Sequence, residues 1–146
     1  MAISLQPAPA SAQKVRITGL ADLAFGSINN FSADASIAQD VCVYSQASGY
    51  LVTATGAGPG GAFELASGSL RLPVEVQWSD SPGQTIGTAL SPGVPLAGPS
   101  SAATQQTCNA GPLTSASLIV LLRAAALGAA TSGSYSGTLT LIIAPN

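Results

Sequence analysis

The amino-acid sequence predicts an all-β domain built as a sandwich of two sheets, and three observations carry this prediction. Short stretches alternate apolar with polar residues. The clearest stretch is "SLRLPVEVQWS", where one face holds Leu70, Leu72, Val74, Val76 and Trp78. Six or seven such stretches follow one another, separated by turns rich in glycine and proline, of which the chain has 16 and 10. We therefore expect a helix content near zero.

The length of 146 residues suffices for one domain with a buried core. Residues 1–13 contain Pro7 and Pro9 among small residues, so we expect an extended arm there. The sandwich domain is expected to span residues 14–146.

The first strands are predicted to be short. "KVRIT" places Val15 and Ile17 on one face, and "LADLAFGSI" follows, with a turn glycine at Gly26. "NNFSADAS" predicts a loop. "DVCVYS" and "GYLVTATG" then predict two strands on either side of a break at Ser48-Gly49.

Pro73 interrupts the alternating run 70–78 and indicates an edge strand or a bulge. Residues 79–112 are rich in proline, glycine, serine and threonine and predict a long looped region, with one short strand near Cys108. "SLIVLLR" predicts a buried strand, and a helix over 118–130 competes with it because the run is rich in alanine and leucine. "YSGTLTLIIAP" predicts the last strand.

Charged residues make up only 7% of the chain, and the mean hydropathy is +0.42. Soluble domains usually have about a quarter of their residues charged. The four basic residues are scattered, so the basic stripe that nucleic-acid binding requires is missing. The surface must consist of small polar residues, which is typical of extracellular bacterial proteins and of subunits that cover one another.

Catalytic and metal-binding patterns are missing from the sequence. There is no histidine, which excludes Ser-His-Asp and Cys-His catalysis and histidine metal sites. The six acidic residues are isolated from one another, so no carboxylate pair is predicted. "GAGPGG" matches a dinucleotide pattern, but a strand-like stretch follows instead of a helix, so we interpret residues 56–61 as a glycine hairpin loop. We expect no enzyme, no cofactor and no metal.

The two cysteines, Cys42 and Cys108, are too few for a four-cysteine zinc site. In an oxidising compartment they would form a long-range disulfide, which contributes roughly 4 kcal/mol in the loop-entropy model. Two buried free thiols in a cytosolic protein are the alternative.

The end of the sequence leaves a strand without an evident neighbour. Leu139, Leu141 and Ile143 share one face, and only three residues follow. In an immunoglobulin-like sandwich of seven strands, the last strand lies between the first and the penultimate one. We therefore expect an incomplete immunoglobulin-like β-sandwich that lacks this last strand.

The vacant position would be an apolar acceptor groove. Val15 and Ile17 are expected on one wall, and Leu139, Leu141 and Ile143 on the other. Both walls would offer unpaired backbone groups, a risk for aggregation. A donor strand supplied from outside would complete the sandwich by β-augmentation.

The same residues carry a family resemblance. The pattern Gly133-x-Tyr135-x-Gly137-x-Leu139-x-Leu141-x-Ile143-x-Pro145 resembles the carboxyl-terminal strand of bacterial chaperone–usher pilins. "LADLAFGSI" is similar to an early stretch of the spore coat protein U-like pilin domains of the archaic chaperone–usher systems.

The resemblance implies a structural subunit of a surface fimbria that reaches the cell surface through the periplasm. Its partners would be a periplasmic chaperone that lends a strand, an outer-membrane usher and other pilus subunits. In the fibre, the amino-terminal extension of the next subunit replaces the chaperone strand. In the arm of this chain Ile3 and Leu5 alternate as a donor would, whereas Pro7 and Pro9 remove two backbone donors.

Two other interpretations stay open. A pilus-tip adhesin would share the fold and bind a surface through the loops over 56–61 or 82–99. A self-contained secreted carbohydrate-binding sandwich would be a stable monomer with an exposed aromatic patch. The position of Trp78 on the apolar face of its strand favours the core over such a patch.

Overall fold

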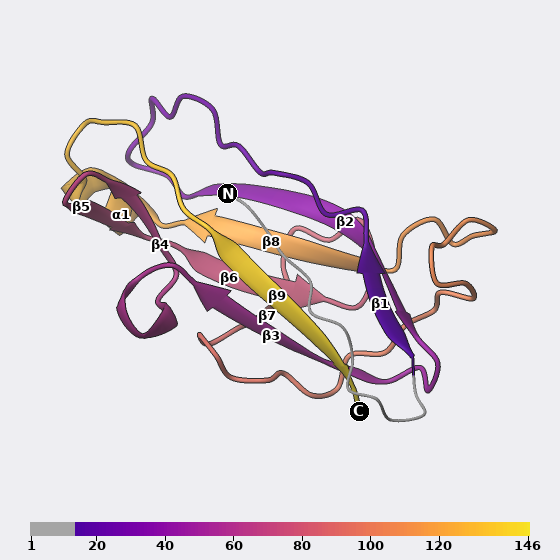
Figure 1. The fold of residues 1–146 in the computed structure, drawn as a ribbon. Coiled ribbons are helices and arrows are strands. Elements are labelled where there is room, and N and C mark those ends of the chain that lie inside the picture. The colour runs from indigo at the N-terminus through magenta and orange to yellow at the C-terminus, as the bar shows by residue number, and fades with distance from the viewer. Residues whose placement is uncertain (1–13) are drawn as a thin grey trace.

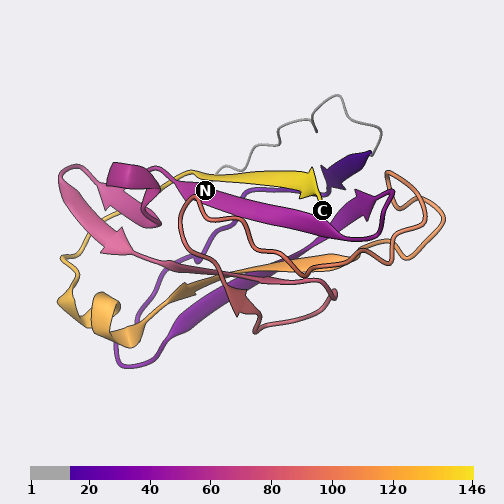
Figure 2. The same cartoon turned by 90° about the horizontal axis from the view of Figure 1, so that it is seen from below.

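The computed structural model describes residues 14–146 and shows an all-β sandwich of two layers (Figures 1 and 2). The first layer is an antiparallel sheet in the order β1-β2-β8-β6-β7. Its strands are β1 (Val15–Thr18), β2 (Ala35–Ser45), β8 (Ala116–Leu122), β6 (Glu75–Ser79) and β7 (Thr88–Ala89). This arrangement confirms the predicted all-β sandwich and is compatible with an immunoglobulin-like one.

The second layer consists of β3 (Tyr50–Gly56) and β9 (Leu139–Pro145), which pair antiparallel, and of the hairpin β4 (Glu64–Ser67) and β5 (Leu70–Pro73). A single bridge between Ala66 and Ser136 joins β4 to the chain just ahead of β9. The hairpin therefore extends the β3–β9 layer (Figure 1).

Alternation of side chains builds the core between the layers. The main cluster contains Val41 and Val43 of β2, Val52 of β3 and Trp78 of β6, all at most 1% exposed. A second cluster lies at the α1 end of the sandwich and consists of Leu65, Leu72, Leu122 and Leu127. The predicted core position of Trp78 is confirmed.

The alternating run 70–78 continues through two strands in different layers. β5 ends at Pro73, and β6 begins at Glu75, where it joins β8 in the other sheet. Pro73 needs no N–H for the β4–β5 ladder, because its backbone faces away from β4, as proline on an edge strand does, and the Val74 N–H still donates to the Phe63 carbonyl at 3.0 Å before the chain crosses. Leu72, Val76 and Trp78 are buried as predicted, whereas Leu70 is exposed beside the hairpin turn.

The glycine loop over 56–61 is not a hairpin. β3 and β4 run antiparallel to the same stretch, 136–145, so the chain leaves the sheet after Gly56 and returns in the same direction. A short 3-10 turn, Pro59–Gly61, forms the excursion, and its ends meet where the Gly58 N–H donates to the carbonyl of Ala62. A Cβ at Gly56 would collide with that carbonyl, so only glycine fits there.

The region around 118–130 contains both of the structures predicted for it, first a strand and then a helix. β8 covers the apolar part, and the helix α1 (Ala124–Ala129) follows it directly. With α1 as a single short helix, the predicted near-zero helix content is confirmed. The expected strand near Cys108 is wrong: the short strand of the looped region is β7, and residues 101–115 contain turns and bends but no strand.

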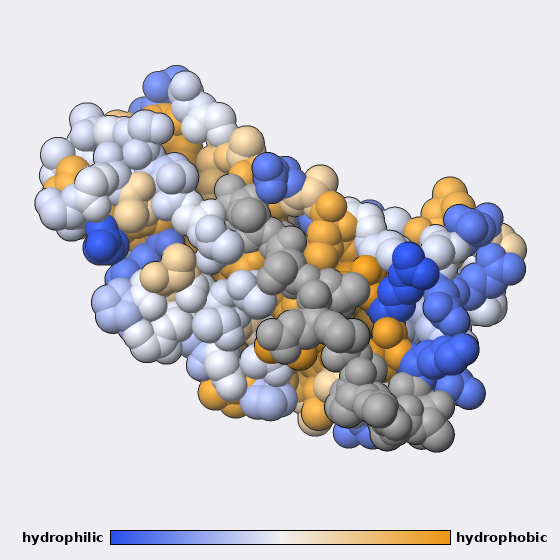
Figure 3. All heavy atoms as spheres, in the orientation of Figure 1, coloured by the Kyte–Doolittle hydropathy of each residue, from blue (hydrophilic) through white to orange (hydrophobic). Residues whose placement is uncertain are grey.

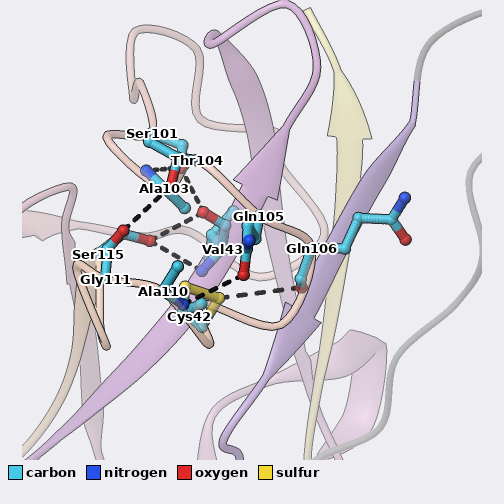
Figure 4. The surroundings of a disulfide bond; sticks show 11 residues. Cys42, Val43, Ser101, Ala103, Thr104, Gln105, Gln106, Ala110, Gly111 and Ser115 are labelled. Carbon is cyan, nitrogen blue, oxygen red and sulfur yellow. Dashed lines mark hydrogen bonds between the residues drawn. A yellow bond between two sulfur atoms is a disulfide. The ribbon is translucent and has the colours of Figure 1, made fainter.

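The predicted disulfide is confirmed: Cys42 on β2 bonds to Cys108, with their Cα atoms 6.1 Å apart (Figure 4). The backbone of the neighbouring residue, Val43, bonds to the side chains of two serines. Ser115 Oγ accepts from the Val43 N–H and donates to the Val43 carbonyl, both at 2.8 Å, and Ser101 donates to the same carbonyl. The disulfide thus belongs to a tight junction between β2 and the loop over 101–115.

Within residues 14–146 no helix is long and apolar enough to cross a membrane. On the face that Figure 3 presents, pale residues cover the left half, blue residues gather toward the right-hand end, and orange residues lie between them.

Candidate functional site

The face of β9 toward the core carries the three aliphatic residues singled out in the sequence. Leu139, Leu141 and Ile143 are at most 2% exposed, and they pack in the main cluster between the layers. The alternate residues of β9 are half-buried and point outward. The period of two in "LTLIIAP" therefore fixes which face meets the core.

The backbone of β9 uses one edge for β3. On β3, Val52 and Ala54 bond away from β9, to Leu96 and Gly93 of the following loop. Because antiparallel ladder bonds alternate along a strand, the residues between them face β9. Their partners on β9 are Thr140, Ile142 and Ala144.

The N–H and C=O groups of Leu139, Leu141 and Ile143 consequently point to the opposite edge of β9. Among residues 14–146 no strand pairs with this edge. Pro145, the next residue in the same phase, has no N–H to offer. We call this side of β9 the open edge.

A second edge without a strand partner among residues 14–146 belongs to β1. The Gln46 N–H donates to the carbonyl of Lys14 at 2.9 Å, which sets the phase of the β1–β2 ladder. Val15 and Ile17 therefore turn their backbone groups away from β2. Ile17 is 3% exposed and lies in the main cluster, and Val15 is half-buried against it.

The two edges converge at one end only. β1 and β9 lie side by side near the C-terminal end of β9 and diverge toward its start (Figures 1 and 2). Where they meet, their Cα atoms come within 8 Å, yet no ladder joins them within residues 14–146. A strand between them would need about 9–10 Å, twice the usual strand spacing. Its insertion would push the two edges apart.

Beyond the diverging ends lies a hollow of about 800 Å³. Two segments form its walls, one following β1 and one leading into β9, and Leu65, Leu72, Leu122 and Leu127 form its floor. The residues that line it carry no charge. Within the second wall, the Tyr135 hydroxyl donates to the Thr131 carbonyl at 2.6 Å.

The structure thus brings all five predicted groove residues to the two facing edges. The predicted donor residues Ile3 and Leu5 lie outside the described residues. The acceptor role of the edges stays a prediction, since strand pairing with a partner is a property of an assembly.

Sequence reasoning missed Gln39. The sequence predicts a loop over 29–36 and a strand only from Asp40, yet β2 begins at Ala35 and places Gln39 in the same phase as the buried Val41 and Val43. Its side-chain amide bonds twice to the backbone of Ala21. A polar residue in the inward phase of "ASIAQDVCV" is the signal that could have found it.

The charges around the open edge are few. Lys14 and Arg16 flank the β1 side, and β9 carries no charged residue. Two groups of charges lie elsewhere on the described surface. Arg71 pairs with Glu64 at 4.0 Å, and at the start of α1 Arg123 bonds to Glu75 at 2.7 and 2.8 Å and to Asp34 at 3.1 Å. Asp34 also accepts from the Ala124 N–H. This bond and the Arg123 guanidinium hold the pKa of Asp34 below its usual range, and Arg123 does the same for the pKa of Glu75.

On the β3 side, the core holds a polar contact between two aromatic residues. Trp78 Nε1 donates to the Tyr50 hydroxyl at 3.0 Å, and the two rings meet edge to face. Burial raises the pKa of Tyr50 to about 12. This pair satisfies both polar groups inside the core and is structural.

Among the described residues, no group of three or more His, Cys, Asp or Glu side chains lies close enough together to bind a metal ion. No family model matches the chain, and no characterised protein in the curated set matches it either. The edges of β1 and β9 that have no ladder partner in the described part of the chain are therefore the feature on which a function can be argued.

Proposed function

We propose that this chain is a structural subunit of a bacterial surface pilus, assembled by donor-strand complementation through a chaperone–usher pathway. The supporting observation is the pair of facing edges without ladder partners, β1 and β9, within residues 14–146. Unpaired strand edges with apolar side chains beneath them are liabilities in a free protein. They are binding surfaces when a partner adds a strand.

The donor strand would lie between β1 and β9 and bond to the backbone of Val15 and Ile17 on one side and of Leu141 and Ile143 on the other. A periplasmic chaperone would supply it first, and another pilus subunit would replace it. The buried disulfide suits an oxidising compartment on the route to the surface. The sparse charge of the chain suits subunits that cover one another.

The test uses two neighbouring residues of β1 in the full chain. Val15→Asp puts a charge on the half-buried face at the gap, whereas Arg16→Asp changes the exposed face of the same strand. Light scattering across a wide range of concentration should show growing assemblies for the wild type and for Arg16→Asp. Val15→Asp should stay monomeric, because a buried charge without a partner opposes strand insertion.

A second measurement guards against simple loss of folding. Amide exchange by NMR should show the Thr140 and Ile142 amides protected in every variant, and the Leu141 and Ile143 amides protected only in assemblies. A wild type that stays monomeric with the Leu141 and Ile143 amides fully protected would overturn the proposal. It would favour a self-contained binding module.

A further inference from the structure

The wall that continues β1 is built differently from β1 itself. Residues 19–31 follow β1 toward the hollow, and they contain no strand or helix. Within residues 14–146, none of their backbone groups bonds to another backbone group. Such a stretch has few bonds to break before it can move.

Apolar contacts and one side chain hold this wall in place. Leu20 and Leu23 rest half-buried on the main cluster, and Phe25 and Ile28 rest on the second. The side-chain amide of Gln39 accepts from the Ala21 N–H at 3.3 Å and donates to the Ala21 carbonyl at 3.0 Å. The Gln39 side chain thus makes with Ala21 the two bonds that the backbone of a neighbouring strand would make.

From this construction we infer that residues 19–31 are a movable wall of the gap between β1 and β9, and that Gln39 is the latch that keeps the wall closed. The inference rests on the proposed function. β1 and β9 converge at one end only, and beyond β1 residues 19–31 form a wall of the hollow into which a strand longer than β1 would extend. β9 is bonded to β3 along its whole length and β1 to β2, whereas beyond Gly19 the wall is held by apolar contacts and by the two bonds between Gln39 and Ala21.

Displacement of the wall would also give the incoming strand more to bind. Once Ala21 is released, its own N–H and C=O join the other backbone groups of residues 20–25 that can pair with an extended peptide. The partner is therefore expected to be a strand longer than the four residues of β1. Apolar residues on one of its faces would take over the contacts of Leu20 and Leu23.

The test compares two glutamines in the full chain. Gln39→Met keeps the length of the side chain and removes both bonds to Ala21. Gln77→Met is the matched control, because Gln77 lies in the same sheet and accepts a single bond from the Gly87 N–H. By NMR, Gln39→Met should speed exchange of the Ala21 amide by roughly tenfold and leave Gly87 unchanged, and Gln77→Met should do the reverse.

Assembly kinetics separate the latch from the function. Light scattering should show the Gln39→Met chain assembling several times faster than the wild type, with Gln77→Met at the wild-type rate. If the wild type assembles and Gln39→Met does so at the same rate, the latch is wrong and the proposed function stands. If no variant assembles while Ala21 still loses protection in Gln39→Met, the proposed function fails and the latch is only a feature of the free chain. Unchanged exchange at Ala21 would overturn the latch in either case.

Discussion

The two outer edges of the β3–β9 layer differ in what occupies them. Along β3, the loop over 93–101 bonds to Tyr50, Val52 and Ala54, and its prolines Pro95 and Pro99 have no N–H with which to extend the sheet. Along the open edge of β9, residues 14–146 provide no comparable cover. We call the loop over 93–101 the proline cover.

Within residues 14–146, the chain covers one edge of this layer and not the other. The proline cover occupies an edge that could otherwise pair with other chains. The β9 edge has buried aliphatic side chains next to backbone groups without a partner in the described part of the chain, a combination that suits an incoming strand. The predictions below test whether the two edges behave as differently as they are built.

The largest effect is expected from removal of the disulfide, which ties β2 to the loop that follows the proline cover. Replacing Cys42 and Cys108 together by alanine should lower the free energy of unfolding by roughly 4 kcal/mol, because a 66-residue separation is no longer cross-linked. Urea unfolding of the oxidised wild type and the double variant measures the difference.

The same variant distinguishes the two edges. Exchange of the Val52 amide, which bonds to the proline cover, should rise more than exchange of the Ile142 amide, which bonds within the β3–β9 ladder. Equal increases at both positions would mean that the disulfide stabilises the sandwich as a whole and not the cover.

The second prediction concerns Tyr50, the β3 residue that carries both a cover bond and the core contact with Trp78. Tyr50→Phe should cost about 1–3 kcal/mol, because the Trp78 N–H is left buried without an acceptor. Urea unfolding at neutral pH measures this loss, and Tyr135→Phe, whose hydroxyl bonds in an exposed turn, serves as the matched control.

Alkaline pH provides an independent reading of the same residue. Since the pKa of Tyr50 is raised to about 12 in the folded state, its contribution is complete below pH 10 and is lost as the pH rises toward 12. The stability of the wild type should therefore fall by roughly 2–3 kcal/mol over that range, and Tyr50→Phe should lack this part of the decline. A parallel decline in both proteins would contradict the assignment.

These local features differ in how far the sequence predicts them. Alternation places Leu139, Leu141 and Ile143 on one buried face, because a strand has a period of two whatever its neighbours are. Even spacing and turn residues likewise predict the all-β class. The disulfide follows from a count of two cysteines and the compartment they suit.

Other features depend on contacts between distant segments, which periodicity does not encode. The direction of β4 after the glycine loop is set by the bridge between Ala66 and Ser136, so a hairpin was a reasonable but wrong prediction. The proline cover pairs with β3 over a sequence separation of 44 positions, from Val52 to Leu96, and the cover has no alternating pattern that would predict this pairing. Gln39 acquires its role only because Ala21 folds back onto β2.

The smallest effect is expected at Asp80, which ties the end of the proline cover to β6. Asp80 Oδ2 accepts from the Ser100 N–H at 3.0 Å, on an exposed part of the surface. Asp80→Ala should lower the free energy of unfolding by about 1 kcal/mol or less, because an exposed hydrogen bond competes with water. Asp22→Ala removes the same charge from an exposed residue that has no hydrogen bond or ion pair within residues 14–146, and it should change stability very little.

The informative readout is local: amide exchange at Tyr50 and Val52 should rise in Asp80→Ala and stay constant in Asp22→Ala, while Ile142 is unchanged in both. If Asp80→Ala leaves Tyr50 and Val52 as protected as before, the proline cover is held by its own backbone bonds, and β3 is a closed edge without help from this side chain.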